Sequence, residues 1–468
     1  MSNQDGLNIP KGEILGHPKG LYLLFATEMW ERFSYYGMRA LLVLSMVAAT
    51  SSTNPGFGWD NSAALTLYAW YTGFSYFTPL VGGWLADNFL GQRKAVVIGG
   101  IIMAIGQFTL SISVAQNLTL FYVGLVVLIL GNGLFKANIS TMVGDLYPKG
   151  DARRDSAFSI FYMGVNLGAF LAPLVCSTLG ENPSYGWRYG YMAAGIGMTL
   201  SAIIQIVLSR RFLGDVGVQP SAHRAKAQSG GTHAPLTSEE RDRLKVIFML
   251  FVFVMLFWAS FEQAGGLMNL YASEKTNRLL GSFEVPAGWF QSMNPLFIVL
   301  LAPLFGMFWV RLSKNGKGGM PTPYKMMLGL LLTGLGFVFM VAAVFDQQAH
   351  GKASMIWLTL AYLLHTMGEL CISPVGLSMV TKLAPMRLAS VMMGVWFLIN
   401  FFANLLAGYI GVYAEKAGEL TVFAGLAIVL CLFAVVLWFL AGKLVYWMHG
   451  AENTSPQEPV MVEPDGAA

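Results

Sequence analysis

Residues 214–243 read GDVGVQPSAHRAKAQSGGTHAPLTSEERDR, and this polar run decides how the rest of the chain is organised. It is too polar to cross a membrane, and it has almost no apolar residues that a folded domain could bury. We therefore interpret residues 212–243 as a linker without transmembrane helices, in preference to the alternative of a small regulatory domain. The segments on either side, 20–211 and 244–447, are similar in length and strongly apolar.

Long apolar stretches recur through both of these segments, each near or above the roughly 20 residues that an α-helix needs to cross a bilayer. The predicted helices are 20–49, 62–87, 95–114, 118–146, 157–179, 187–210, 244–272, 288–311, 323–345, 354–382, 388–413 and 421–447. A chain built from two six-helix halves is typical of transporters. The predicted fold class is therefore an all-α membrane protein with twelve transmembrane helices in two six-helix bundles.

The composition excludes several other classes of protein. Only 12% of residues are charged, against about 25% in soluble proteins, and 55% are hydrophobic, so a water-soluble enzyme is ruled out. The net charge of +4 is small and the basic residues cluster in short loops, which gives no support to nucleic-acid binding. The three cysteines have neither a disulfide pattern nor a metal-binding spacing, and no metal site is predicted.

The positions of lysine and arginine predict the orientation, because these residues accumulate in cytoplasmic loops. With the N-terminus inside, 21 of the 29 basic residues lie in loops or at helix ends on the cytoplasmic side, and three lie well inside predicted helices. The five basic residues expected on the other side of the membrane are Arg188, Lys275, Arg278, Lys352 and Lys416. We therefore expect the tails 1–19 and 448–468 to be cytoplasmic.

Away from the helix ends, seven charged residues lie well inside the predicted helices: Glu28, Glu31, Arg32, Arg39, Lys136, Glu262 and Glu369. Each would cost roughly 3 kcal/mol at the centre of a membrane, so they are expected to face a watery cavity and to pair with one another. The alternative is a set of salt bridges that only fixes the helix register. Four carboxylates and three cations leave one carboxylate in excess, and a buried carboxylate without a partner is expected to carry a proton.

The first helix concentrates these groups on one side. At 100° per residue, a sector of about 100° holds Glu28, Arg32, Tyr35, Tyr36 and Arg39, with Glu31 at its edge. Other polar or aromatic groups that could line the same cavity are Tyr76, Tyr162, Asn166, Trp258, Asn294, Trp396 and Asn400. A single tyrosine or asparagine in a membrane helix more often forms a helix-to-helix hydrogen bond, which remains the alternative for each.

Several motifs make the sequence resemble the proton-dependent oligopeptide transporter family of the major facilitator superfamily. Residues 28–39 read EMWERFSYYGMR, which is similar to the family's ExxER motif, and residues 82–95 read GGWLADNFLGQRKA, similar to the superfamily's gating motif. Further matching segments are GNGLFKANIS (131–140), FSIFYMGVNLGAFLAP (158–173), FWASFEQ (257–263) and GELCISPVGLSMV (368–380). Many bacterial relatives insert two extra helices between the bundles, whereas the linker here has no apolar span.

The resemblance implies a role for each matching residue. Arg39 and Lys136 would bind the C-terminal carboxylate of a peptide, and Glu369, with Asn166 and Asn294, its ammonium group. Protons would be coupled to transport through Glu28, Glu31, Arg32 and Glu262, with Glu262 opposite Arg39. Pockets for peptide side chains would be lined by Tyr35, Tyr36, Tyr76, Tyr162, Trp258, Trp396, Phe397 and Asn400. The gating motif contributes Asp87, Arg93 and Lys94.

The expected function is a symporter that imports di- and tripeptides, and peptidomimetics, by alternating access in a bacterial inner membrane. It would act as a monomer, use the proton gradient and need no cofactor. The alternative on the same fold is a proton-coupled carrier of nitrate or another small anion, which would have no use for Glu369. A channel is disfavoured by the two-half layout, and a membrane-embedded enzyme by the absence of nucleophile or metal motifs.

Overall fold

The computed structural model describes residues 10, 12–113, 117–148, 151, 153–220, 236–314, 319–385 and 388–451. Parts of the predicted tails and residues 221–235 of the predicted linker lie outside the described residues. The part of the chain that is described is dominated by helices, as the sequence predicts.

Twelve long helices occur among the described residues, in agreement with the predicted all-α fold. They are α1 (Lys19–Val47), α2 (Asn61–Leu85), α3 (Gln92–Ser113), α4 (Leu118–Asp145), α5 (Arg153–Gly180), α6 (Trp187–Leu213), α8 (Ser238–Phe261), α10 (Met293–Lys314), α11 (Thr322–His350), α12 (Met355–Leu383), α13 (Ala389–Ala417) and α14 (Glu419–Trp447). By length and composition, ten segments of the described chain are apolar enough to cross a membrane; α1 and α2 are not among them. Helix α1 carries four of the seven charges discussed above.

Short elements occupy the connections. The helical ones are the π-helix η1 (Ala86–Leu90), the 3-10 helices η2 (Glu262–Ala264) and η3 (Ala287–Ser292), and α9 (Leu267–Glu274). The strands are β1 (Glu13–Ile14) with β2 (His17–Pro18), β4 (Leu279–Leu280) with β5 (Phe283–Glu284), both antiparallel, and β3 (Thr276–Asn277) parallel to β6 (Ala353–Ser354). These strands only tie loops together and form no layer of the fold.

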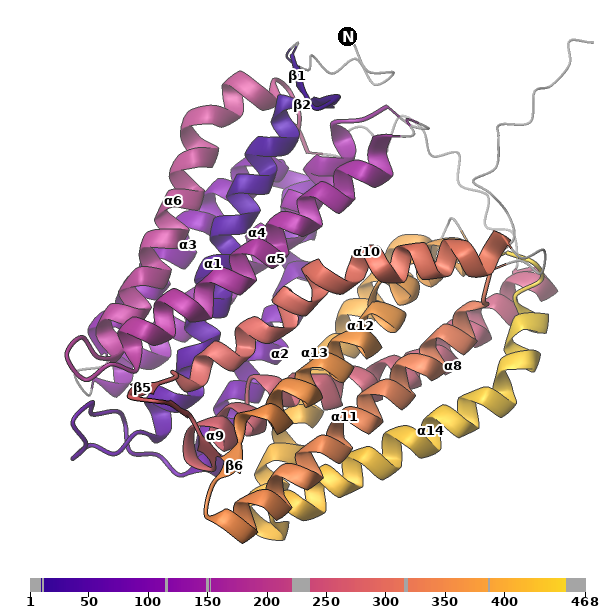
Figure 1. Cartoon of the computed structure of the whole chain (residues 1–468). Helices are drawn as coiled ribbons and strands as arrows, with labels where there is room; N and C mark the ends of the chain where they lie inside the picture. Colours follow the sequence, from indigo (N-terminus) through magenta and orange to yellow (C-terminus); the bar gives the residue numbers. More distant parts are fainter. Residues whose placement is uncertain are drawn as a thin grey trace, which may run out of the picture.

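The long helices form two groups, α1–α6 and α8–α14 (Figure 1). Within the first group α1 packs against α5 and α6, and within the second α11 packs against α12 and α14. Contacts between the groups include α2 with α13 and α5 with η3. The two groups converge toward α9 and β5 and diverge toward the N-terminus (Figure 1). We call the end near α9 the outer end, following the predicted orientation.

The predicted helix 244–272 differs from the structure in two ways. Helix α8 begins earlier, at Ser238, because Thr237 and Glu240 form a capping box: the Thr237 hydroxyl accepts from the Glu240 N–H, and the Glu240 carboxylate accepts from the Thr237 N–H. The segment is also not one helix, since α8 ends at Phe261 and α9 starts only at Leu267. The interruption places Glu262 in the short helix η2.

Candidate functional site

A cluster of three buried charges lies in the middle of α1. The Arg32 Nε lies 2.7 Å from Glu28 Oε1 and 2.8 Å from Glu31 Oε2, and all three side chains are at most 8% exposed. Glu28 and Arg32 meet because residues four apart share one face of a helix. Glu31, at the edge of the predicted sector, is brought to the same guanidinium. Two carboxylates therefore share one positive charge.

The second ion pair joins the two bundles. Arg39 Nη2 of α1 lies 2.6 Å from Glu262 Oε2 of η2, and both side chains are buried. The Arg39 Nε donates a further hydrogen bond of 2.7 Å to the Tyr68 hydroxyl of α2. Tyr68 was not among the predicted site residues, although it precedes the predicted Tyr76 by eight residues and so lies within about 80° of it around the helix.

Gly265 makes room for this arrangement. A Cβ atom at this position would overlap the Tyr68 hydroxyl and lie 2.6 Å from Arg39 Nε. The backbone between α8 and α9 can therefore approach the Arg39 side chain only because residue 265 has no side chain. The break in the predicted helix is thus part of the geometry that brings Glu262 to Arg39.

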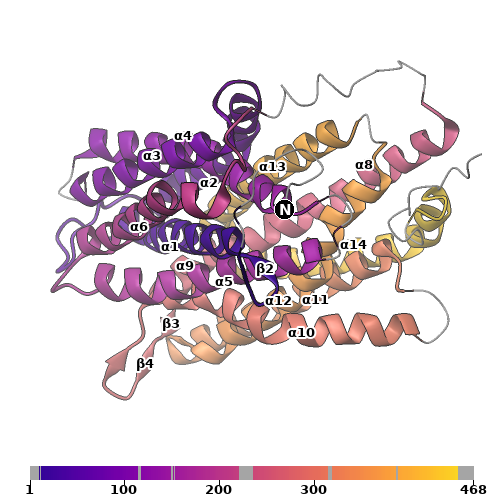
Figure 2. The same cartoon turned by 90° about the horizontal axis from the view of Figure 1, so that it is seen from above.

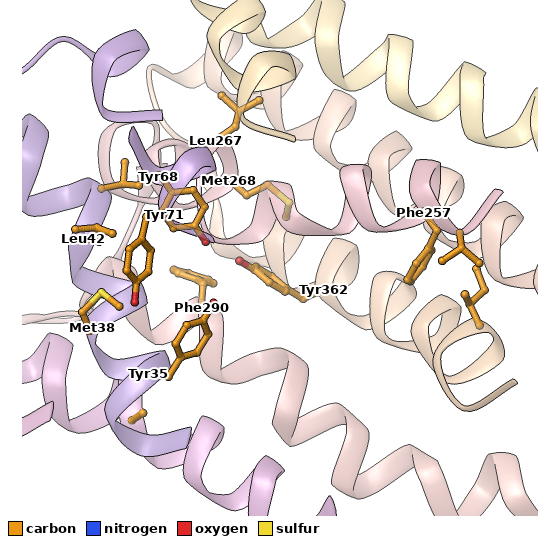
Figure 3. Close-up of a cluster of buried hydrophobic side chains, with 14 of the residues drawn as sticks. Tyr35, Met38, Leu42, Tyr68, Tyr71, Phe257, Leu267, Met268, Phe290 and Tyr362 are labelled. Atoms are coloured by element: carbon orange, nitrogen blue, oxygen red, sulfur yellow. The ribbon is translucent and has the colours of Figure 1, made fainter. Parts of the chain in front are cut away.

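Tyrosines from both bundles surround the same region. Figure 3 shows the hydroxyl groups of Tyr68 and Tyr362 directed toward each other, although Tyr68 belongs to α2 and Tyr362 to α12. The Tyr362 hydroxyl donates to the Ala264 carbonyl at 3.3 Å. Tyr362 was also not predicted as a site residue, because a single tyrosine in an apolar helix does not by itself indicate a binding site.

Lys136 is held by an aromatic ring. Its Nζ lies 3.7 Å from the centroid of the Tyr76 ring, a cation–π contact between α4 and α2. The Arg39 guanidinium lies near the Tyr36 ring in a similar way, at 5.8 Å, and Arg32 lies 5.9 Å from the Tyr35 ring. The predicted cations and tyrosines therefore lie together on the first bundle.

Glu369 forms the acidic group of the second bundle. Its Oε2 accepts a hydrogen bond of 2.7 Å from Asn294 Nδ2, which also lies 3.1 Å from Thr366 Oγ1. Asn166 instead donates to the Tyr162 carbonyl of its own helix at 2.9 Å. The structure thus joins Asn294 to Glu369, whereas the Asn166 amide donates its hydrogen bond within α5.

The remaining predicted pocket residues lie on α8 and α13. Trp258 packs against Phe261, with 5.4 Å between ring centroids, and Trp396 packs against Phe251 at 6.0 Å. Phe397 is partly buried. Asn400 donates to the Trp396 carbonyl of its own helix. The Trp258 Nε1 is buried without a hydrogen-bond partner among the described residues, which leaves one donor for a polar ligand.

The three predicted gating residues lie at the opposite end of the first bundle from α9. Asp87 is in η1 and Lys94 is exposed near the start of α3. Arg93 Nη2 donates to the carbonyls of Gly214 and Val216, at 2.6 and 2.7 Å. Arg93 therefore holds the chain that follows α6. No cluster of three or more potential metal ligands occurs within the described ranges.

Comparisons with known proteins agree with this architecture. The profile of the POT family matches residues 93–229 and 224–423. The peptide transporter YePEPT of Yersinia enterocolitica is 38% identical, over 96% of this chain and 99% of that protein. A di-/tripeptide transporter of Lactococcus lactis subsp. cremoris is 33% identical, over 92% of this chain and 96% of its own length.

A solved structure gives the same result in three dimensions. The crystal structure of a POT family transporter in complex with 5-aminolevulinic acid superposes with a TM-score of 0.85 at 31% identity, and it covers 95% of this chain and 100% of its own. The profile match covers most of the chain, and the two relatives match nearly all of it. The chain therefore belongs to the POT family of transporters, the proton-dependent oligopeptide transporters that its motifs resemble.

Proposed function

We propose that this protein is a proton-coupled symporter that imports di- and tripeptides. The observation that carries the proposal is the division of charge across the site: Arg39 and Lys136 lie on the first bundle and Glu369 lies on the second. A peptide carries a carboxylate at one end and an ammonium group at the other, so it can bridge these groups whatever its side chains are. The relatives named above as peptide transporters support the same conclusion.

Peptide binding is proposed to use the two cations differently. Lys136 rests on the Tyr76 ring, and its ammonium group still has donors for a peptide carboxylate. Arg39 is held by Glu262 at 2.6 Å, so a carboxylate has to compete with Glu262 for it. Protonation of Glu262 would remove that competition and release Arg39 to the substrate.

Glu369 and Asn294 are proposed to receive the peptide ammonium group. Asn166 would join them by giving up its bond within α5. Aromatic residues would form permissive side-chain pockets, and Trp258 has an indole N–H available there. The proposed lining comprises Tyr35, Tyr36, Tyr76, Tyr162, Trp258, Trp396, Phe397 and Asn400. The ligand of the solved relative, 5-aminolevulinic acid, also carries an amino group and a carboxyl group. Peptidomimetics with both charges are therefore proposed as additional substrates.

Proton coupling is proposed to involve the Arg32 cluster as well as Glu262. Glu28 and Glu31 share one guanidinium, and Glu28 Oε2 has no hydrogen-bond partner among the described residues. Protonation of one of these carboxylates leaves one matched ion pair with Arg32. The buried cluster can thus exist with or without a proton while Arg32 stays paired.

The transport cycle is proposed to rock the two halves, residues 20–211 and 244–447, about the central site. The linker 212–243 would stay on the cytoplasmic side with both termini, and Asp87, Arg93 and Lys94 would act in gating at that end. The protein would work as a monomer in a bacterial inner membrane. The proton gradient would be its energy source, without a cofactor.

Uptake by purified protein in liposomes tests the proposal. A labelled dipeptide should accumulate only when an inward proton gradient is imposed; equal uptake with and without the gradient would overturn the coupling. Excess unlabelled dipeptide should block uptake, whereas block by nitrate alone would favour the anion carrier, which the relatives do not support.

A pair of lysine variants sharpens the test of substrate binding. Lys136→Ala should weaken dipeptide binding at least tenfold. Lys443→Ala is a matched control because Lys443 also lies over an aromatic ring, Trp447, but is exposed on α14. Equal effects of the two substitutions would contradict a binding role for Lys136.

A further inference from the structure

A second contact between the bundles lies at the rim of the outer end, away from the charged site. Glu181 directly follows α5 of the first bundle, and its side chain is 15% exposed. The N–H of Ala287 donates to Glu181 Oε2 at 2.6 Å, and the N–H of Gly288 donates to Oε1 at 2.8 Å. Both carboxylate oxygens thus bind the start of η3, which belongs to the second bundle and leads into α10.

Other hydrogen bonds run along the same line of contact. Trp289 Nε1 donates to Thr178 Oγ1 at 2.9 Å, and the Ser292 hydroxyl donates to the Phe170 carbonyl at 2.8 Å. Arg278 lies behind the carboxylate, with Nη1 4.0 Å from Glu181 Oε2. The α5–η3 contact is therefore a continuous polar seam between the two bundles.

The seam requires a glycine at position 288. A Cβ atom there would overlap the Ser177 hydroxyl and lie 3.2 Å from Glu181 Oε1. Any side chain on residue 288 would push η3 away from α5. The absence of a side chain at residue 288 therefore allows η3 to lie in close contact with the end of α5.

The hydrogen bonds of Glu181 have different energetic effects in the closed and the open form of the outer end. Ala287 and Gly288 are buried here, and a buried N–H without a partner is costly. Glu181 satisfies two such groups at once, with the stronger hydrogen bonds that a charged acceptor makes. When the bundles separate, water replaces these partners. The two hydrogen bonds of Glu181 therefore stabilise the closed form of the outer end relative to the open form.

We propose that Glu181, bound to residues 287 and 288, is a latch that holds the outer end closed and must release once in every transport cycle. This inference rests on the proposed function, in which the two halves rock to open alternate ends. It adds a gating residue that acts without contacting peptide and that lies outside the charged cluster of α1.

Distances between spin labels across the outer end test the latch. Labels at Ser184→Cys and Ser282→Cys place one probe on the loop after α5 and one on the exposed hairpin of β4 and β5, which projects from the body of the molecule (Figure 2). A Cys431→Ala background leaves only Cys176 and Cys371, which are buried.

Glu181→Ala is expected to raise the ratio of long to short distances about tenfold, from the loss of two bonds to buried N–H groups. Glu181→Gln, which keeps one acceptor oxygen, should remain closer to the unsubstituted protein. Glu284→Ala is the matched control, because Glu284 also pairs with Arg278 but is 63% exposed. An unchanged distribution in Glu181→Ala, or equal opening in Glu284→Ala, would overturn the latch.

Gly288→Ala tests the same contact from the other bundle without removing a polar group. It should also shift the population toward long distances, and thermal unfolding of each variant shows whether the fold is retained. The distance measurement needs neither peptide nor a proton gradient. Unaltered latch distances would therefore refute the latch alone, whereas a lack of peptide uptake by the unsubstituted protein would refute the proposed function alone.

Discussion

Replacement of Glu262 by glutamine separates proton coupling from peptide binding. The substitution keeps the shape of the side chain and one acceptor oxygen for Arg39 but removes the negative charge. Arg39 stays charged, so the ion pair becomes a hydrogen bond from a charged donor to a neutral amide. Hydrogen bonds to charged groups span about 1.5–3 kcal/mol. The pair that now measures 2.6 Å should therefore move from the upper to the lower end of this range and lose about 1.4 kcal/mol, which is a tenfold change in the balance between closed and open outer ends.

The functional consequence follows from the loss of the titratable group. Glutamine resembles the protonated carboxyl at all pH values, so Arg39 is always available to the substrate and no proton is needed to release it. Gradient-driven accumulation of a labelled dipeptide should fall to the level seen without a gradient. Counterflow exchange, in which internal unlabelled peptide exchanges with external label, should remain measurable because it needs only binding and rocking.

Both assays are made on the same proteoliposomes, with Glu415→Gln as the control. Glu415 is an exposed carboxylate of α13 near the outer end, so its replacement removes an equal charge without touching Arg39. Full gradient-driven accumulation by Glu262→Gln would refute a coupling role for Glu262. Loss of both uptake and counterflow would instead assign it to binding or to folding.

Three further substitutions follow from the geometry. Gly265→Ala should displace the Tyr68 hydroxyl, lower the melting temperature and abolish uptake, whereas Gly442→Ala, where an added Cβ meets open space, should change neither. Glu369→Gln should raise the KM for dipeptides about tenfold, since a charge-assisted bond to the ammonium group is lost; an equal loss of affinity for N-acetylated dipeptides would contradict this. Thr237→Ala removes the cap of α8 and should lower the free energy of unfolding by about 1 kcal/mol with unchanged uptake; thermal unfolding and uptake assays check both, and unaltered stability would show that the cap contributes nothing.

The helices and the polar face of α1 could be predicted from the sequence because both are local properties. A long apolar stretch indicates a membrane helix, and residues four apart, such as Glu28 and Arg32, share a face in any helix. The contact between Glu31 and Arg32 is also local, although the spacing alone places Glu31 at the edge of the sector. These features depend on no other part of the chain.

The pairing between bundles could not be derived in the same way. Arg39 and Glu262 are 223 positions apart, and no periodicity relates them; only the family resemblance placed Glu262 opposite Arg39. The break before α9 was missed because two glycines in an apolar run are equally compatible with close helix packing. Asn400 shows a different limit of sequence-based prediction. It is predicted to line a side-chain pocket, but its amide donates a hydrogen bond to the Trp396 carbonyl of its own helix.

The Arg39–Glu262 pair and the latch at Glu181 close the same end by different means, and the transport cycle would act on them differently. A proton or a peptide carboxylate changes the charge balance at Arg39 directly. Neither the proposed peptide site nor Glu262 contacts the N–H groups of residues 287 and 288 that bind Glu181. The latch would therefore bias the protein toward the outer-closed form at a place that the peptide does not reach, while the ion pair makes closure respond to the peptide carboxylate and to protonation of Glu262. At one fixed pH, a weaker latch should then raise the outward-open fraction by the same factor with and without bound peptide.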